Sequence, residues 1–172
     1  MGFRMLAGAL LAVLPLAAVA EVKLAAADAM LIEHRFTIAA PAAKAWETLV
    51  HPERYWPPDH TWSGKRESLS LDPVAGGCYC ERWDGGSVEH GRVVMAIPGK
   101  VLTLNAALGP FIDMALSGIL SIKLEGKDGV TTAVVTYRVS GDAEHKLDGL
   151  APIVDQVLGL QFGSFAKYAG QP

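Results

Sequence analysis

Acid–base chemistry is the type of reaction that the side chains of this 172-residue sequence could support. Glu81 and His90 lie in neighbouring strand-like segments, and Asp113 and Tyr137 follow farther along the chain. A carboxylate, an imidazole and a phenol can move protons when at least two of them converge within hydrogen-bond reach of a substrate. Because the residue pattern does not show that convergence, the four are weak catalytic candidates and no catalytic residue is assigned.

The orientation of Glu81 decides how useful it could be. Tyr79, Glu81 and Trp83 are alternate residues of one predicted strand and share a face of it. If that face points inward, an apolar pocket raises the pKa of Glu81 and suits it for acid–base use. An outward Glu81, paired with a neighbouring strand, is the favoured interpretation. For His90, which can titrate near neutral pH, a structural or solvent-facing role is favoured.

The two cysteines, Cys78 and Cys80, could pair or remain thiols. In a fully extended strand their Cα atoms would be about 6.6 Å apart, at the outer edge of the range that a disulfide tolerates. Two small buried thiols are the favoured interpretation, and a strained bridge formed in an oxidising compartment is the alternative. The sequence leaves the pairing open.

Metal and cofactor chemistry finds little support in the sequence. A C-x-C pair supplies only two ligands for zinc, and no histidine pair has metal-ligand spacing on a plausible helix. Nucleophile-elbow and phosphate-binding glycine motifs are absent, and Gly85-Gly86 is typical of a turn. We therefore expect no metal and no cofactor. The five histidines are His34, His51, His60, His90 and His145.

The first 20 residues have the pattern of a secretory signal peptide. A single charge, Arg4, precedes an apolar run that ends in the small residues Ala18-Val19-Ala20. The run is shorter than the roughly 20 apolar residues that span a bilayer, which disfavours a retained anchor. We expect cleavage after Ala20 and a periplasmic or secreted protein, although Ala25-Ala26-Ala27 offers a second site. Residues 21–29 are predicted to be a flexible tail.

Residues 30–170 have the length of one domain. The formal charge of the chain is −3, of which Arg4 contributes +1, so the remainder carries −4. A chain of this charge with no basic stripe is a poor partner for nucleic acid. The sequence does not indicate an oligomeric state.

One strand, one short helix, a series of strands and one long helix follow each other in this domain. Alternating residues predict the strands, proline starts the short helix at Pro41, and an apolar face with a period near 3.6 predicts the last helix. Gly159 and Gly163 in that helix either allow close packing or leave room for a guest molecule. The predicted strands are 30–39, 67–71, 77–83, 87–97, 101–108, 118–125 and 130–140, and the helices are 41–50 and 150–168.

An antiparallel sheet and one amphipathic helix can bury their apolar faces together when the sheet curls around the helix, which tends to enclose a cavity. Strand alternation points Val93, Met95 and Ile97 inward, and the apolar segment 109–117 could be a lid, a membrane or partner contact, or part of the core. The predicted ligand-binding residues are Trp56, Trp62, Trp83, Met95, Leu104, Phe111, Met114, Leu120, Tyr137, Leu158 and Phe162.

Several residues, in order and spacing, resemble a known superfamily. The matching positions are Pro41, Trp46, Trp56 or Trp62, Gly76-Gly77, Gly91-x-Val93, Pro98 and Leu102. This pattern resembles the START/Bet v 1-like (SRPBCC) superfamily, in the branch of the activator of the Hsp90 ATPase and polyketide cyclase-like proteins. The resemblance implies an α+β helix-grip fold: a curved antiparallel sheet of six to seven strands around a long C-terminal helix, with a short helix after the first strand.

The resemblance leaves the function open, because the fold serves many activities. The leading hypothesis is an exported protein that binds a small hydrophobic molecule, lipid- or polyketide-like, in an internal cavity. A cyclase or dehydratase acting on a hydrophobic substrate in that cavity is the alternative, and a co-chaperone-like interaction module is a third. Transient membrane contact would suit the first hypothesis.

Overall fold

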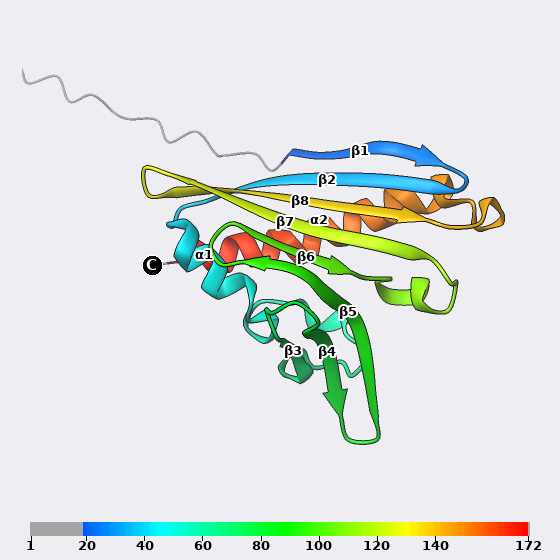
Figure 1. Ribbon diagram of the computed structural model, residues 1–172, viewed down its shortest axis with the longest axis horizontal. Helices are drawn as coiled ribbons and strands as arrows, with labels where there is room; N and C mark the ends of the chain where they lie inside the picture. Colours follow the sequence, from blue (N-terminus) through cyan, green and yellow to red (C-terminus); the bar gives the residue numbers. More distant parts are fainter. Residues whose placement is uncertain (1–18, 172) are drawn as a thin grey trace, which may run out of the picture.

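The computed structural model describes residues 19–171. Eight antiparallel strands form one sheet in the order β1-β2-β8-β7-β6-β5-β4-β3, and a long C-terminal helix, α2, lies against one face of it (Figure 1). The strands are β1 (Val19–Ala26), β2 (Ala29–Ile38), β3 (Leu69–Leu71), β4 (Cys78–Trp83), β5 (Gly86–Ile97), β6 (Val101–Asn105), β7 (Ser117–Lys127) and β8 (Val130–Ser140). The α-helices are α1 (Ala42–Leu49) and α2 (Leu147–Ala169).

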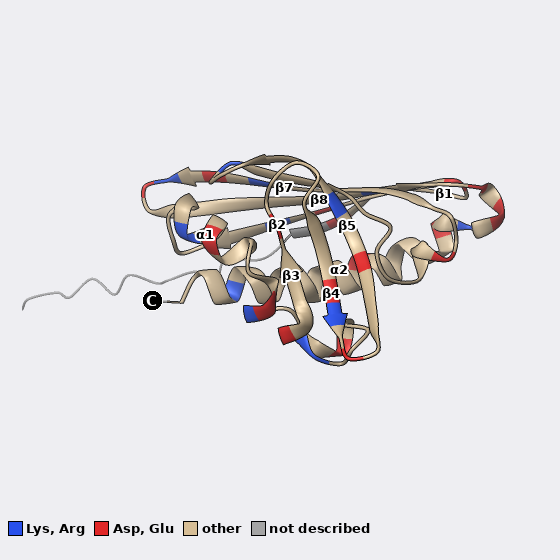
Figure 2. Ribbon diagram, turned by 60° about the horizontal axis from the view of Figure 1, so that its bottom comes forward, with Lys and Arg blue, Asp and Glu red and all other residues tan. Residues whose placement is uncertain are grey.

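The sheet curves over α2, as the turned view shows (Figure 2). Short 3₁₀ turns make up much of the remaining chain: η1 (Pro52–Arg54), η2 (Pro58–His60), η3 (Arg66–Ser68), η4 (Gly109–Ile112) and η5 (Ala143–His145). The predicted α+β architecture, with a curved sheet around the C-terminal helix and a short helix near its start, is therefore confirmed. The sheet has eight strands instead of six to seven because β1 adds one, so the short helix follows the second strand. None of the helices in residues 19–171 is long and apolar enough to cross a membrane.

The core lies between the concave face of the sheet and α2. Alternate residues of β6, β7 and β8 are buried as predicted, because one face of each strand packs against the helix while the other meets solvent. Phe162 and Phe165 supply the largest buried side chains of α2. The buried hydrophobic residues on the inward face of the three strands are Leu102, Leu104, Leu120, Ile122, Leu124, Ala133, Val135, Tyr137 and Val139.

The first strand departs from the sequence analysis. Most of residues 21–29, predicted to be a flexible tail, form β1 and the turn into β2, with Glu21 opposite Glu33 and Val22 opposite Ile32. Alanine-rich stretches carry little strand propensity, so the pairing with β2 depends on tertiary context. Most of the predicted leader, Met1–Ala20, lies outside the described residues.

Two β-bulges in β5 alter the expected orientation of its side chains. Tyr79 pairs with Gly91 and Cys80 with Glu89, so His90 is the extra residue of the first bulge. Val94 is the extra residue of the second, since the partners of Leu104 and Thr103 are Val93 and Met95. A bulge shifts the alternation by one residue. The prediction that Met95 and Ile97 face inward is therefore wrong: both are almost half exposed.

The glycines of α2 allow the helix to lie close to the sheet. A Cβ atom on Gly159 would lie 3.1 Å from Cε1 of His34, and one on Gly163 would lie 3.9 Å from Cε1 of Phe36. Neither glycine lines the cavity described below. Of the two roles that the sequence leaves open, close helix–sheet packing is the one observed.

Candidate functional site

A cavity of about 320 Å³ lies between α2 and the sheet. Its volume falls in the range of small-molecule sites, which starts at about 300 Å³. Five parts of the chain form the wall: the loop after α1, the β4–β5 pair, the β6–β7 connection, β8 and the first half of α2. The lining residues are Trp56, His60, Thr61, Trp62, Tyr79, His90, Leu108, Gly109, Pro110, Phe111, Tyr137, Leu150, Ile153, Val154, Val157, Leu158 and Gln161.

Tyr137, a predicted catalytic and ligand-binding residue, is fully buried at this wall and holds the β6–β7 connection in place. Its hydroxyl group donates to the carbonyl of Ala106 and accepts from the N–H of Leu108, at 3.0 Å each. Burial raises the pKa of Tyr137 to about 12, although the hydrogen bond from Leu108 acts in the opposite direction. The hydroxyl therefore stays protonated, and its position indicates a structural role.

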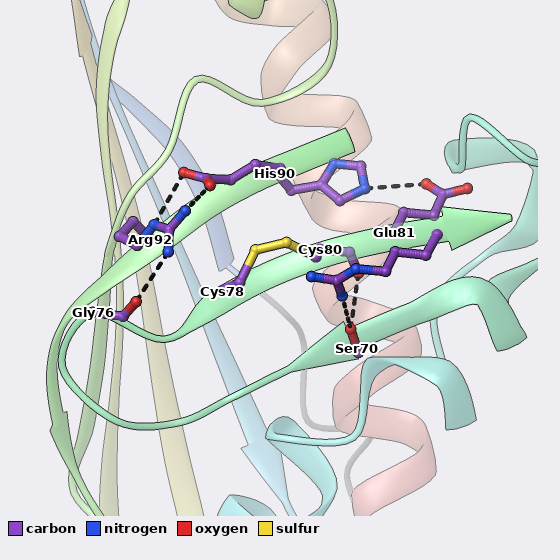
Figure 3. Close-up of a disulfide and its surroundings, with 9 residues drawn as sticks. Ser70, Gly76, Cys78, Cys80, Glu81, His90 and Arg92 are labelled. Atoms are coloured by element: carbon purple, nitrogen blue, oxygen red, sulfur yellow. Dashed lines mark hydrogen bonds and ion pairs between the residues drawn. A yellow bond between two sulfur atoms is a disulfide. The ribbon is translucent and has the colours of Figure 1, made fainter. Parts of the chain in front are cut away.

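Glu81 and His90 form a buried pair beside the cavity (Figure 3). Nε2 of His90 lies 3.1 Å from Oε2 of Glu81, and the backbone N–H groups of Trp62 and Ser63 donate to the same carboxylate at 3.0 and 2.6 Å. The favoured interpretation of an outward Glu81 is wrong, and of the structural or solvent-facing role favoured for His90 the structure excludes the solvent-facing one. Glu81 points inward because alternation places it on the same face of β4 as Tyr79. His90 points inward because it is the extra residue of the first bulge, which shifts the alternation of β5.

The electrostatics of this pair differ from the expectation of a raised carboxyl pKa. Burial by itself raises the pKa of Glu81, but the hydrogen bonds from Ser63, Trp62 and His90 outweigh burial and lower it. Burial lowers the pKa of His90 more than Glu81 raises it. At neutral pH an ionised Glu81 can only accept, so Nε2 of a neutral His90 carries the proton and Nδ1 keeps a lone pair.

A disulfide joins Cys78 and Cys80 within β4 (Figure 3). The favoured interpretation of two thiols is therefore wrong. The Cα atoms are 5.4 Å apart, closer than in a fully extended strand, so the bridge fits the usual range. This contraction lies opposite the bulge at His90, because Tyr79 and Cys80 pair with the residues on either side of it.

The structure brings five of the predicted ligand-binding residues to the cavity wall. Leu104, Leu120 and Phe162 lie beside it, around a separate void of about 20 Å³. Trp83 and Met95 are partly exposed and do not line the cavity, and Met114 packs against the core instead. Asp113 is exposed in the loop after η4, which removes it from the candidate acids. The five at the wall are Trp56, Trp62, Phe111, Tyr137 and Leu158.

Sequence reasoning missed the polar residues Tyr79 and Gln161 of the wall. Gln161 lies among the apolar residues of the inner face of α2, three positions after Leu158, and this break in an otherwise apolar pattern was a usable signal. Tyr79 shares a strand face with Glu81, so an inward Glu81 implies an inward Tyr79. Within residues 19–171, no group of three or more His, Cys, Asp or Glu side chains could hold a metal ion.

Comparison with known proteins shows the fold through solved structures. No protein-family model matches the chain, and no curated protein sequence does. A protein from Thermobifida fusca is 18% identical with a TM-score of 0.59, over 81% of this chain and 93% of that one. The allergen Ara h 8.0201 is 17% identical with a TM-score of 0.55, over 82% and 97%.

DynU16, from the dynemicin biosynthetic locus, is 17% identical with a TM-score of 0.55, over 80% of this chain and 46% of that one. These identities are low, so the matches show the fold alone. The chain therefore has the helix-grip fold of the START/Bet v 1-like proteins, as its resemblance in sequence implied.

Proposed function

We propose that the protein binds a small hydrophobic molecule, lipid- or polyketide-like, in the cavity between α2 and the sheet. The observation that carries the proposal is a cavity of about 320 Å³ whose wall is mostly apolar. Leu108, Phe111, Val154 and Leu158 are among its side chains, and none of the 17 lining residues carries a full charge when its histidines are neutral. The DynU16 structure supports the polyketide-like class, since DynU16 comes from the dynemicin biosynthetic locus.

The apolar wall can supply the affinity without a charged anchor. Burial of apolar surface contributes about 25 cal/mol per Å². A molecule that loses about 300 Å² of apolar surface to solvent would gain about 7 kcal/mol before the entropic cost of association is subtracted. Since a dissociation constant of 1 μM corresponds to about 8 kcal/mol, we expect a dissociation constant well above 1 μM for a ligand held by this apolar burial alone.

Native mass spectrometry tests this proposal directly. The protein is exported from a homologous host and weighed before and after denaturation, and we expect a bound mass that denaturation releases. Val157→Trp should lose that mass because the indole fills the cavity, whereas Leu160→Trp should keep it because Leu160 lies on the exposed side of the same helix. A protein without a bound mass that also takes up no added lipophile would contradict the proposal.

A second candidate function, an acid–base enzyme acting in the same cavity, is favoured by one observation. Glu81 holds His90 at the cavity wall in a fixed tautomer, as a general base requires. His90→Gln, which keeps the Glu81 carboxylate and the loop that it holds, should leave ligand binding largely intact if the protein is a carrier. The same variant should abolish turnover of the copurified ligand if the protein is an enzyme.

We also propose that the protein functions after export, because Met1–Ala20 has the pattern of a cleaved leader. The mature chain would then begin at Glu21 and keep residues 21–26 of β1. The N-terminal sequence of the protein from the periplasmic or culture fraction tests this, and an intact Met1 in that fraction would contradict it.

A further inference from the structure

Two polar atoms at the cavity wall lack a hydrogen-bond partner. They are Oη of Tyr79 and Oε1 of Gln161, and neither finds a partner among the described residues. Tyr79 is 5% exposed and Gln161 is 8% exposed, so bulk water does not cover them. Buried polar groups without partners are uncommon in folded proteins because each is costly to desolvate, which makes such a pair informative.

The two side chains belong to opposite walls of the cavity, one from β4 and the other from α2. The ring of Trp56 joins these walls, since its centroid lies 5.8 Å from that of Tyr79 and 5.8 Å from that of Phe162, the residue next to Gln161. His90 lies beside them, with its ring centroid 5.0 Å from that of Tyr79. Trp56 therefore contacts both elements that carry the unpartnered polar atoms.

Most of the remaining wall is apolar, with His60 and Thr61 as its other polar residues apart from Tyr137. Leu150, Ile153 and Val154 lie two to three turns before Gln161 along α2, and Phe111 comes from the β6–β7 connection. The hydroxyl of Tyr137 is not available to bind a ligand, because it already donates to the carbonyl of Ala106 and accepts from the N–H of Leu108. The cavity thus offers a mostly apolar wall with two unpartnered polar atoms.

The unpartnered atoms of Tyr79 and Gln161 have opposite hydrogen-bonding roles, since one is a donor and the other an acceptor. Burial raises the pKa of Tyr79 well above 10, so its phenol remains an O–H donor. The amide oxygen of Gln161 is only an acceptor. A hydroxyl group can accept from the first and donate to the second at once, whereas an ether or a ketone can only accept and a hydrocarbon can do neither.

We propose that the ligand is an apolar molecule with a hydroxyl group at one end, and that Tyr79 and Gln161 bind this hydroxyl between β4 and α2. This inference rests on the proposed function, which it deepens by naming the chemical class of the ligand.

Isothermal titration with two probes of the same shape tests the inference. 2-Naphthol carries a hydroxyl where 2-methylnaphthalene carries a methyl group, so their difference in affinity reports recognition of the hydroxyl. We expect the wild-type protein to bind 2-naphthol about tenfold more tightly, as a buried hydrogen-bonded pair typically gives.

Tyr79→Phe and Gln161→Met should each remove most of that preference without lowering the affinity for 2-methylnaphthalene. Tyr168→Phe, at the exposed end of α2, is the matched control.

The outcomes separate this inference from the proposed function. Equal affinity of the wild-type protein for the two probes overturns the hydroxyl site and means that water only satisfies the two atoms, while the carrier function stands. Binding of neither probe, with no copurified ligand, overturns both.

A ligand can also copurify although neither probe binds, and its fragmentation in the mass spectrometer then identifies its functional groups. A ligand with a hydroxyl group supports the inference, and one without a hydroxyl group overturns it. The wild-type comparison needs no variant, so a variant that fails to fold does not remove the test.

Discussion

Glu81 connects more of the site than any other single residue in it. Its carboxylate accepts from the backbone of Trp62 and Ser63 and from His90, so it ties the loop after α1 to β4 and β5. Trp62 and the residues just before it line the cavity, and their position depends on this carboxylate. The residue that looks catalytic by type thus has a structural role in shaping the wall.

Removing this carboxylate should be costly. Glu81→Ala leaves the buried His90 and the partly buried N–H groups of Trp62 and Ser63 without their acceptor, and we expect the free energy of unfolding to fall by about 2–4 kcal/mol. Glu89→Ala, on the exposed face of the adjacent strand, should cost far less. Urea denaturation followed by circular dichroism measures both. Equal losses for the two variants would show that Glu81 does not stabilise the loop.

The lowered pKa of His90 makes stability depend on pH. Since its pKa in the folded protein lies below the ordinary value of 6.5, the unfolded chain takes up the proton first as the pH falls. The free energy of unfolding should therefore be lower at about pH 5.5 than at about pH 7.5. Glu81, whose pKa is also lowered, adds a further loss below its ordinary value of 4.5.

His90→Gln should reduce the difference in unfolding free energy between those two pH values, since it removes the titrating group. His145→Gln, in the turn before α2, controls for the loss of a histidine elsewhere. Denaturant titrations at both pH values give the comparison. An unchanged pH dependence in His90→Gln would assign the effect to another group.

At the scale of elements, α2 contains a pair of glycines whose substitution should have different effects. Gly163→Ala places its new methyl at ordinary contact distance from Phe36, so the higher helix propensity of alanine should stabilise the protein by up to about 1 kcal/mol. Gly159→Ala brings the methyl to 3.1 Å from the buried ring of His34, which must move, so the gain should shrink or reverse. Thermal unfolding ranks the two, and an equal gain for both would mean that His34 moves freely.

The strands were predictable where alternation is regular. In β6, β7 and β8 every inward residue follows from the two-residue period, and the hairpin turns were recognisable from glycine and aspartate. β5 was not predictable, because a bulge depends on how a strand pairs with its neighbours and leaves little local trace in sequence. The errors at Met95 and His90 both come from those bulges.

The site was predictable in part for the same reason. Trp56, Trp62 and Phe111 were found because aromatic residues in proline- and glycine-rich loops are unusual. The contact between Glu81 and His90 was not found, since it requires both the inward face of β4 and the extra residue in β5. The disulfide was disfavoured because an ideal strand separates its two cysteines too far, and the local contraction of β4 brings them closer.

At the scale of the whole molecule, β1 covers the outer edge of β2 and sets where the chain can be cut. Cleavage after Ala20 leaves residues 21–26 paired with β2, whereas cleavage after Ala27 removes the strand. The carbonyl of Ala27 also accepts from the N–H of Leu147 at the start of α2. The two small-residue sites in the sequence therefore have very different structural consequences.

Two truncated proteins test this difference. A chain beginning at Glu21 should give a single species in size-exclusion chromatography, while a chain beginning at Asp28 should form larger, concentration-dependent species through the bare edge of β2. The shorter chain should also be less stable, because α2 loses its packing partner in β1. Identical elution of the two chains at high concentration would show that β1 is dispensable.

The positions of the tryptophans allow their fluorescence to report where in the cavity a guest molecule is bound. Two of the four indoles, Trp56 and Trp62, line the cavity, and the first is buried while the second is about half exposed. An aromatic guest whose absorption overlaps indole emission would accept excitation energy from both, while a solvent quencher such as iodide would reach Trp62 in preference to Trp56. Time-resolved emission could therefore distinguish a guest seated deep beside Trp56 from one held at the rim, without any label on the protein.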